Sequence, residues 1–115
     1  MLYKDLEVWK ESIKLVKNIY EITNKYPKKE IFGITSQIRR CVVSIPSNIA
    51  EGAVKHSDKE TLRFLDIALG SLAELDTQMI ISEQLEYIDN YEDIKVQISK
   101  VNALLIGFMK YHSKQ

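Results

Sequence analysis

The chain has 115 residues, of which 28% are charged and 45% hydrophobic, and its 16 Lys and Arg balance its 16 Asp and Glu. A chain of this size buries roughly two-thirds of its unfolded surface on folding, which predicts one domain spanning residues 1–115. The apolar runs are far short of a membrane span and the first residues are charged, so the composition excludes a membrane partner. The single cysteine, Cys41, excludes an internal disulfide and fits the reducing cytoplasm, where we expect the protein.

The first of four segments with helical periodicity covers residues 6–26 and ends before Pro27, which cannot continue a helix. It carries two apolar stripes, and we expect the stripe with the aromatic residues to face the core. Packing is therefore the expected use of Trp9 and Tyr20. The expected core stripe is Leu6, Trp9, Ile13, Val16 and Tyr20, and the second is Val8, Leu15, Ile19 and Ile22.

The second helical segment begins near Thr35 or Ser36, whose hydroxyls can accept bonds from the first free amides, and reaches about Lys55. Pro46 lies inside this segment. Because proline removes one backbone hydrogen bond and clashes with the preceding turn, we expect a kink there. A break into two short helices is the alternative, but it would leave Ile45 as a poor cap.

The third segment opens with a capping box, Ser57 and Glu60, and reaches about residue 86. The fourth starts at residue 89 or 90, each followed by an acidic residue three positions later, and frays after residue 111. The apolar stripe of the third segment is Leu62, Leu65, Leu69, Leu72 and Met79, and that of the fourth is Ile94, Ile98, Val101, Leu105 and Phe108.

These four segments predict an all-α protein, an antiparallel up-down-up-down four-helix bundle with a proline-kinked second helix. Strand signals are absent, and helices of about twenty residues joined by short loops pack as antiparallel neighbours. Small residues are concentrated on the second and third helices, which predicts close packing there. They are Ser44, Ser47, Ala50, Gly52 and Ala53 on one helix, and Ala68, Gly70, Ser71 and Ala73 on the other.

Residues 41–54, CVVSIPSNIAEGAV, carry a single charge, Glu51. At 100° per residue the second helix has two apolar stripes, and its own core can cover only one of them. The core stripe is Ile34, Ile38, Val42, Ile45 and Ile49. We expect another copy of the chain to cover the other stripe, which predicts a homo-oligomer. The predicted interface consists of Arg39, Val43, Pro46, Ala50 and Val54.

The sequence carries no pattern typical of catalysis. Neither His56 nor His112 follows a Glu by three residues, as a di-iron bundle requires, and no Cys and His spacing suits zinc. We therefore expect no enzyme activity, metal, cofactor or small-molecule substrate. Asp76 continues a core stripe, and we expect its carboxylate to pair with Arg39 or Arg40 rather than to serve catalysis. Arg39 lies beside the second stripe and is the better candidate for an ion pair between subunits.

The charge distribution places a basic patch at one end of the predicted bundle. In this topology the N-terminus, the second loop and the C-terminus share an end, where six basic residues face Asp5, Asp58 and Glu60, a net charge of +3 per chain. Around a ring, such patches would form a positive collar that can hold a phosphate backbone. An ordinary solvated end is the alternative. The basic residues are Lys4, Lys55, Lys59, Arg63, Lys110 and Lys114.

Three stretches carry a resemblance to a known family. They are YKDLEVWKESIKLV (residues 3–16), FGITSQIRRCVVSIPSNIAEG (residues 32–52) and SDKETLRFLDIALGSLAELDTQ (residues 57–78). Together they resemble the four-helix-bundle proteins encoded in intervening sequences of 23S ribosomal RNA genes. That resemblance implies a bacterial cytoplasmic protein and a ring-shaped homopentamer. The family is similar to the accessory protein of diversity-generating retroelements, a pentameric barrel that partners a reverse transcriptase and binds nucleic acid.

The resulting hypothesis is a non-catalytic, homo-oligomeric bundle that acts as an RNA- or nucleoprotein-associated accessory factor. Its partners would be further copies of itself and RNA, or an enzyme that handles nucleic acid. The alternative is a scaffold or adaptor that binds only protein, for example a reverse transcriptase, and does not contact nucleic acid. RNA binding that weakens steeply with salt distinguishes the first hypothesis from the second.

Overall fold

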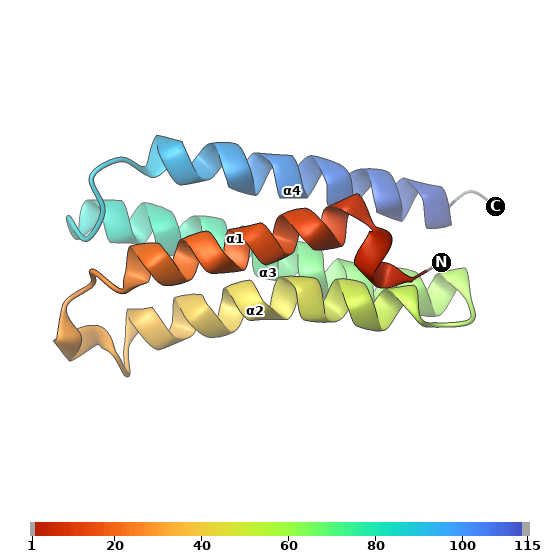
Figure 1. Ribbon diagram of the computed structural model, residues 1–115, viewed down its shortest axis with the longest axis horizontal. Helices are drawn as coiled ribbons and strands as arrows, with labels where there is room; N and C mark the ends of the chain where they lie inside the picture. Colours follow the sequence, from red (N-terminus) through yellow and green to blue (C-terminus); the bar gives the residue numbers. More distant parts are fainter. Residues whose placement is uncertain (1, 114–115) are drawn as a thin grey trace.

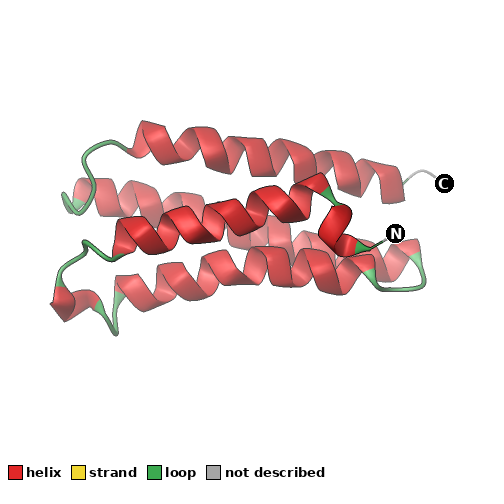
Figure 2. Ribbon diagram, viewed as in Figure 1, coloured by secondary structure: helices red, strands yellow, loops and turns green. Residues whose placement is uncertain are grey.

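The computed structural model describes residues 2–113 and contains four α-helices (Figure 1). The helices are α1 (Glu7–Thr23), α2 (Ile34–Ala53), α3 (Asp58–Gln84) and α4 (Tyr91–His112). Two short 3-10 turns, η1 (Tyr3–Asp5) and η2 (Lys28–Glu30), precede α1 and α2. Residues 2–113 contain no strand (Figure 2). The prediction of an all-α protein with four helices is confirmed.

Successive helices run in opposite directions in Figure 1, and the bundle measures 46 × 25 × 20 Å. The N-terminus, the α2–α3 loop and the C-terminus lie at one end, while the α1–α2 and α3–α4 loops lie at the other. Each helix packs against two others, because α1 and α3 both contact α2 and α4. None of the helices within residues 2–113 combines the length and hydrophobicity that a membrane crossing needs.

The ends of α3 and α4 follow from their capping residues. Ser57 Oγ accepts a hydrogen bond from the backbone N–H of Glu60, as the capping box predicts, and Asn90 Oδ1 accepts one from the N–H of Glu92. The predicted cap of α2 is wrong, because Gly33 is the N-cap residue and no side chain caps it. The Thr35 hydroxyl is buried and has no hydrogen-bond partner.

Pro46 is buried inside α2, and the helix continues past it to Ala53 as a single element. The alternative of two short helices is therefore not what the chain adopts. Side chains next to Pro46 donate hydrogen bonds to backbone carbonyls of the same helix. Ser47 Oγ donates to the Val43 carbonyl at 2.8 Å, and Asn48 Nδ2 donates to the Ser44 carbonyl at 2.8 Å. The bend that Pro46 imposes remains a prediction.

The core lies along the bundle axis, and the expected core stripe of α1 is wrong at Ile13 and Tyr20, whereas Leu6, Trp9 and Val16 are half-buried against the core. Ile13 and Tyr20 are 41% and 39% exposed, whereas Leu15 and Ile19 of the other stripe are fully buried. The buried line of α1 is hard to recognise from hydrophobicity, because it also contains Ser12 and Thr23. The hydroxyls of both residues donate to carbonyls of their own helix. The core stripes of α2, α3 and α4 are confirmed at Ile38, Val42, Ile45, Ile49, Leu65, Leu72, Met79, Ile94, Ile98, Val101 and Leu105.

Helices α2 and α3 approach each other closely near Gly52. A Cβ atom on Gly52 would lie 3.1 Å from both Phe64 Cβ and the Thr61 carbonyl oxygen. The Thr61 hydroxyl donates to the Gly52 carbonyl at 2.8 Å, which joins the two helices directly. Farther along the same contact the hydroxyls of Ser44 and Ser71 lie 2.7 Å apart. The predicted close packing of small residues therefore holds for these positions, whereas a Cβ atom on Gly70 would have nothing within 4 Å of it.

Candidate functional site

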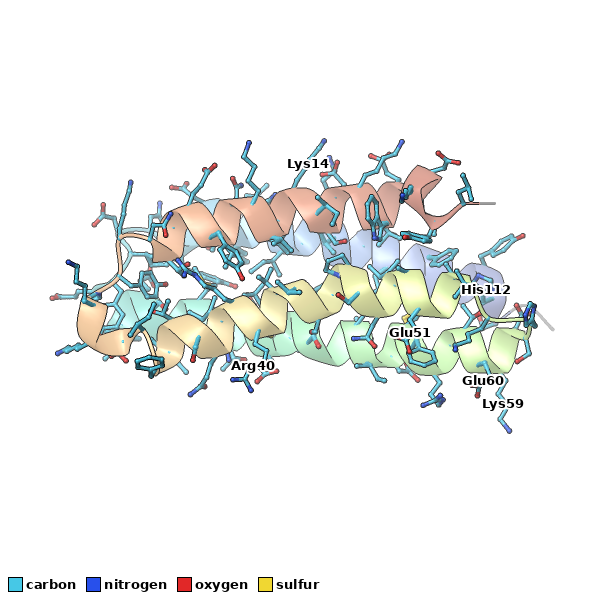
Figure 3. All side chains as sticks on the ribbon, turned by 60° about the horizontal axis from the view of Figure 1, so that its bottom comes forward. Lys14, Arg40, Glu51, Lys59, Glu60 and His112 are labelled. Atoms are coloured by element: carbon cyan, nitrogen blue, oxygen red, sulfur yellow. The ribbon has the colours of Figure 1, made fainter. Side chains whose placement is uncertain are left out.

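The end of the bundle that carries both termini gathers the predicted basic residues. We call Lys4, Lys55, Lys59, Arg63 and Lys110 the basic end. Lys4 lies in η1, Lys55 follows α2, Lys59 and Arg63 lie in the first turns of α3, and Lys110 lies near the end of α4. Figure 3 shows Lys59, Glu60 and His112 together at this end. The sixth predicted residue, Lys114, lies outside the described residues.

Two cations of the basic end lie against a buried aromatic ring, that of Phe64. Lys55 Nζ lies 5.0 Å from the centre of the Phe64 ring, and Arg63 Cζ lies 4.6 Å from it. Cations within about 6 Å of a ring centre are attracted to its face. The sequence reasoning missed Phe64, although an aromatic residue directly after Arg63 was the available signal.

Carboxylates partly offset these cations. Arg63 Nη2 lies 3.3 Å from Glu60 Oε1. The pKa of Glu60 is lowered, first by its hydrogen bond to Arg63 and then by the charges of Arg63, Lys55 and Lys59. His112 Nδ1 lies 2.7 Å from Asp58 Oδ1, which joins the end of α4 to the start of α3. Within the described residues, the basic end sets five cations against Asp5, Asp58 and Glu60, a net charge of +2.

A second candidate surface is the outer face formed jointly by α1 and α2. Ile13 and Tyr20 lie seven residues apart on one side of α1, and Val43 and Ala50 lie seven residues apart on one side of α2. The Arg39 guanidinium stacks 4.7 Å from the Tyr20 ring centre, which brings the two sides together. We call Ile13, Tyr20, Arg39, Val43 and Ala50 the α1–α2 face.

Of the five predicted interface residues, two are clearly exposed. Val43 is 40% and Val54 57% exposed, Ala50 and Arg39 are half-buried, and Pro46 is buried. Arg39 is held within its own chain. Its Nε donates to Thr23 Oγ1 and its Nη2 donates to Asn24 Oδ1, both at 2.9 Å. The stripe of α1 that was expected to face the core supplies the exposed Ile13 and Tyr20 instead.

The expected ion pair of Asp76 is wrong. Asp76 accepts a hydrogen bond from the Tyr91 hydroxyl of α4, and neither Arg39 nor Arg40 reaches it. Burial, followed by the Asp76 carboxylate, raises the pKa of Tyr91 to about 12. Arg40 instead lies on the edge of α2 toward α3, on the same side as Glu51 (Figure 3). Asp76 thus joins α3 to α4.

Cys41 lies in the α2–α3 contact and is buried. Its Sγ lies 2.9 Å from the Ser71 carbonyl oxygen and 3.6 Å from Glu74 Oε1. Burial, with the Glu74 charge next, raises the pKa of the thiol to about 12. A thiol nucleophile reacts as the thiolate, so this geometry suits packing rather than chemistry.

Comparisons with known proteins agree with this architecture. The sequence matches the family described as 23S rRNA-intervening sequence protein over residues 4–107. A crystal structure of a protein of unknown function from the S23 ribosomal protein family of Bacteroides thetaiotaomicron is similar, with a TM-score of 0.82 and 27% sequence identity. The similarity covers 90% of this chain and 98% of that one. A comparison with curated proteins found no match. From the match over residues 4–107, the chain belongs to the 23S rRNA-intervening sequence protein family.

Proposed function

We propose that the protein is a non-catalytic homo-oligomer, a ring of five copies, that acts as an RNA- or nucleoprotein-associated accessory factor in the cytoplasm. The observation that carries the RNA association is the basic end, where Lys55 and Arg63 lie against the Phe64 ring within 5.0 Å of its centre. Cations ordered in this way lose less side-chain freedom when they bind phosphate. The family's description names a 23S rRNA intervening sequence, which also supports an association with RNA.

The α1–α2 face supports the assembly. Ile13, Tyr20 and Val43 are each about 40% exposed, and Arg39 of α2 lies against the Tyr20 ring of α1. Contiguous exposed apolar areas commonly mark protein interfaces. Copies packed side by side would bring their basic ends to the same rim, where repeated positive patches attract a phosphate backbone more strongly than one patch does.

The assembly is tested by light scattering. We expect a mass near five times the 13.3 kDa of one chain at micromolar concentration. Ala50→Glu should dissociate or unfold it, because an unpaired carboxylate in an apolar contact typically costs several kcal/mol. The matched control is Ala103→Glu, which places the same charge on an exposed position of α4. A monomeric wild-type protein would refute the proposed assembly.

RNA association is tested by gel-shift titration of a structured RNA over a salt series. The double variant Lys59→Gln and Lys110→Gln should bind more weakly, and its log–log salt slope should fall by about 0.7 to 0.9 for each phosphate that is no longer neutralised. The matched control, Lys10→Gln with Lys17→Gln, removes the same charge from exposed positions of α1. Equal weakening in both variants would contradict a specific role of the basic end. An oligomer that binds no RNA at low salt would favour the protein-only adaptor.

A further inference from the structure

Phe32 is the most exposed large apolar residue of the described chain. It lies between η2 and α2 and is 95% exposed, and the adjacent Ile31 is 47% exposed. The segment around it is held in place. The Gly33 N–H donates to the Glu30 carbonyl at 2.8 Å, and the Tyr87 hydroxyl donates to Glu30 Oε2 at 2.7 Å. The phenyl ring therefore projects from a fixed support.

A cavity of about 330 Å³ lies at the same end of the bundle, where the end of α1 meets the α3–α4 loop. Its lining is half apolar, and its polar half contains two carboxylates and one lysine. The apolar lining residues are Ile22, Tyr87, Ile88 and Ile94, and the polar lining residues are Lys25, Asp89, Asn90 and Asp93.

The two loops carry opposite charge. Residues 24–33 contain Lys25, Lys28 and Lys29 against Glu30, a net charge of +2. Residues 83–93, which are the α3–α4 loop with the adjoining helix ends, contain five Asp and Glu and no Lys or Arg, a net charge of −5. Figure 1 shows the two loops at one end of the bundle, the α1–α2 loop along its lower edge and the α3–α4 loop along its upper edge. In copies that stand side by side with parallel long axes, the basic loop of one copy would face the acidic loop of the next at the same height.

We infer that Phe32 of each copy inserts into the α3–α4 loop cavity of the neighbouring copy, with Lys28 and Lys29 opposite that copy's Asp89 and Asp93. The contact is heterologous, since it joins two different surfaces of the same chain, and its repetition can close a ring. A second copy fits better than another protein, because this chain itself carries Phe32, the cavity and both charged stretches, all at the same end of the bundle. The inference rests on the proposed homo-oligomer and specifies its contact.

Disulfide trapping tests this contact. In a Cys41→Ser background, Phe32→Cys and Ile88→Cys chains are co-expressed and oxidised. A disulfide needs Cα atoms within about 7 Å, so only a close approach of the two positions gives a product. We expect a covalent dimer from the mixture and none from either variant alone, and a ladder of multimers from the chain that carries both cysteines. A dimer from Phe32→Cys alone would indicate a symmetric contact and overturn the inference.

Variants provide a second readout. Phe32→Ala should raise the dissociation constant of the assembly on the order of 10- to 100-fold, as expected when one buried aromatic ring is removed from an interface. The control is Tyr111→Ala, which removes an aromatic ring that is 67% exposed at the other end. Lys29→Glu should weaken assembly, and adding Asp89→Lys should restore it.

The outcomes separate this contact from the proposed function. If the wild-type protein is an oligomer but Phe32→Ala keeps its mass and no mixed disulfide forms, the contact is wrong and the assembly stands. If Phe32→Ala keeps the wild-type mass and weakens RNA binding, Phe32 stacks on bases and the inference is overturned. A monomeric wild-type protein refutes the contact together with the proposed assembly.

Discussion

Three glycines within helices provide a test of the packing between α2 and α3. Gly52 lies in α2, Gly70 in α3 and Gly107 in α4. Replacing Gly by Ala in a helix interior stabilises by about 1 kcal/mol, because Ala restricts the unfolded chain. A methyl group at Gly70 or Gly107 meets nothing within 4 Å, so each change should stabilise the protein by about that amount.

Gly52→Ala should have the opposite sign. Its methyl group would lie 3.1 Å from Phe64 Cβ and from the Thr61 carbonyl oxygen, and neither atom is the end of a flexible side chain. Overpacking of this kind typically costs about 1–3 kcal/mol, which exceeds the helix gain at a position one residue before the end of α2. We therefore expect Gly52→Ala to destabilise by about 1 kcal/mol, a difference of about 2 kcal/mol from Gly70→Ala.

Urea unfolding followed by far-ultraviolet circular dichroism measures these changes. The measurement should be repeated at several protein concentrations, because assembly adds to the apparent stability. Gly107→Ala serves as the control for helix propensity, since its site is open. If Gly52→Ala proves as stable as Gly70→Ala, the close approach of α2 and α3 at Gly52 is not a tight contact and the packing argument fails.

Three further predictions concern Glu11, Cys41 and Pro46. Lys14 and Lys100 lower the pKa of the Glu11 carboxyl below its usual value, so its contribution to stability is present above the usual pKa and is lost as the pH falls through the lowered one. Glu11→Gln should flatten this acid dependence in urea midpoints, and an unchanged profile would contradict it. The Cys41 thiol, with a pKa raised to about 12, should resist a thiol reagent at neutral pH until urea unfolds the chain, whereas rapid labelling of the native protein would refute its burial. Pro46→Ala should raise helicity but weaken assembly by light scattering if the expected kink shapes the α1–α2 face, and unchanged assembly with higher thermal stability would show the kink to be incidental.

The sequence predicted the helix boundaries where a local interaction determines them. The first helix ends at Thr23, three residues before the end predicted from Pro27, and the side chains of Ser57 and Asn90 cap the third and the fourth. It failed at the start of α2, where Gly33 precedes the helix and no side chain caps it. Capping depends on neighbouring residues alone, so these boundaries can be predicted without tertiary information.

The orientation of α1 could not be predicted in the same way. Two apolar stripes of similar length run along this helix, and periodicity does not say which one faces inward. The buried line includes Ser12, Thr23 and Glu11, which a hydrophobic pattern counts against it. Backbone bonds satisfy the two hydroxyls, and Lys14 and Lys100 pair with the carboxylate. Tertiary contacts therefore decided the orientation of α1.

In the candidate site, too, the features set by topology were predictable from the sequence and those set by tertiary contacts were not. Topology and charge counting were sufficient to place Lys55, Lys59 and Arg63 at one end of the bundle. The partner of Asp76 was not predictable, because it depends on the rotation of α3 against α4, which brings Tyr91 rather than an arginine to the carboxylate. The position of Lys55 on the Phe64 ring likewise depends on how the α2–α3 loop folds back.

A net charge of zero conceals a strong separation of charge along the bundle. The basic end carries +2 within the described residues, whereas residues 83–93 at the other end carry −5. In the proposed ring, the basic residues 24–33 of each copy would lie against the acidic residues 83–93 of the next. Assembly would thus leave one rim positive, while the other rim would keep a net charge of −3 per copy from these two stretches. Because salt screens charges, it should weaken both the contact between neighbouring copies and the binding of RNA to the basic end. The double variant Lys29→Glu and Asp89→Lys should regain the assembly that Lys29→Glu alone weakens. The salt dependence of its RNA binding should stay that of the wild-type protein, because neither residue lies at the basic end.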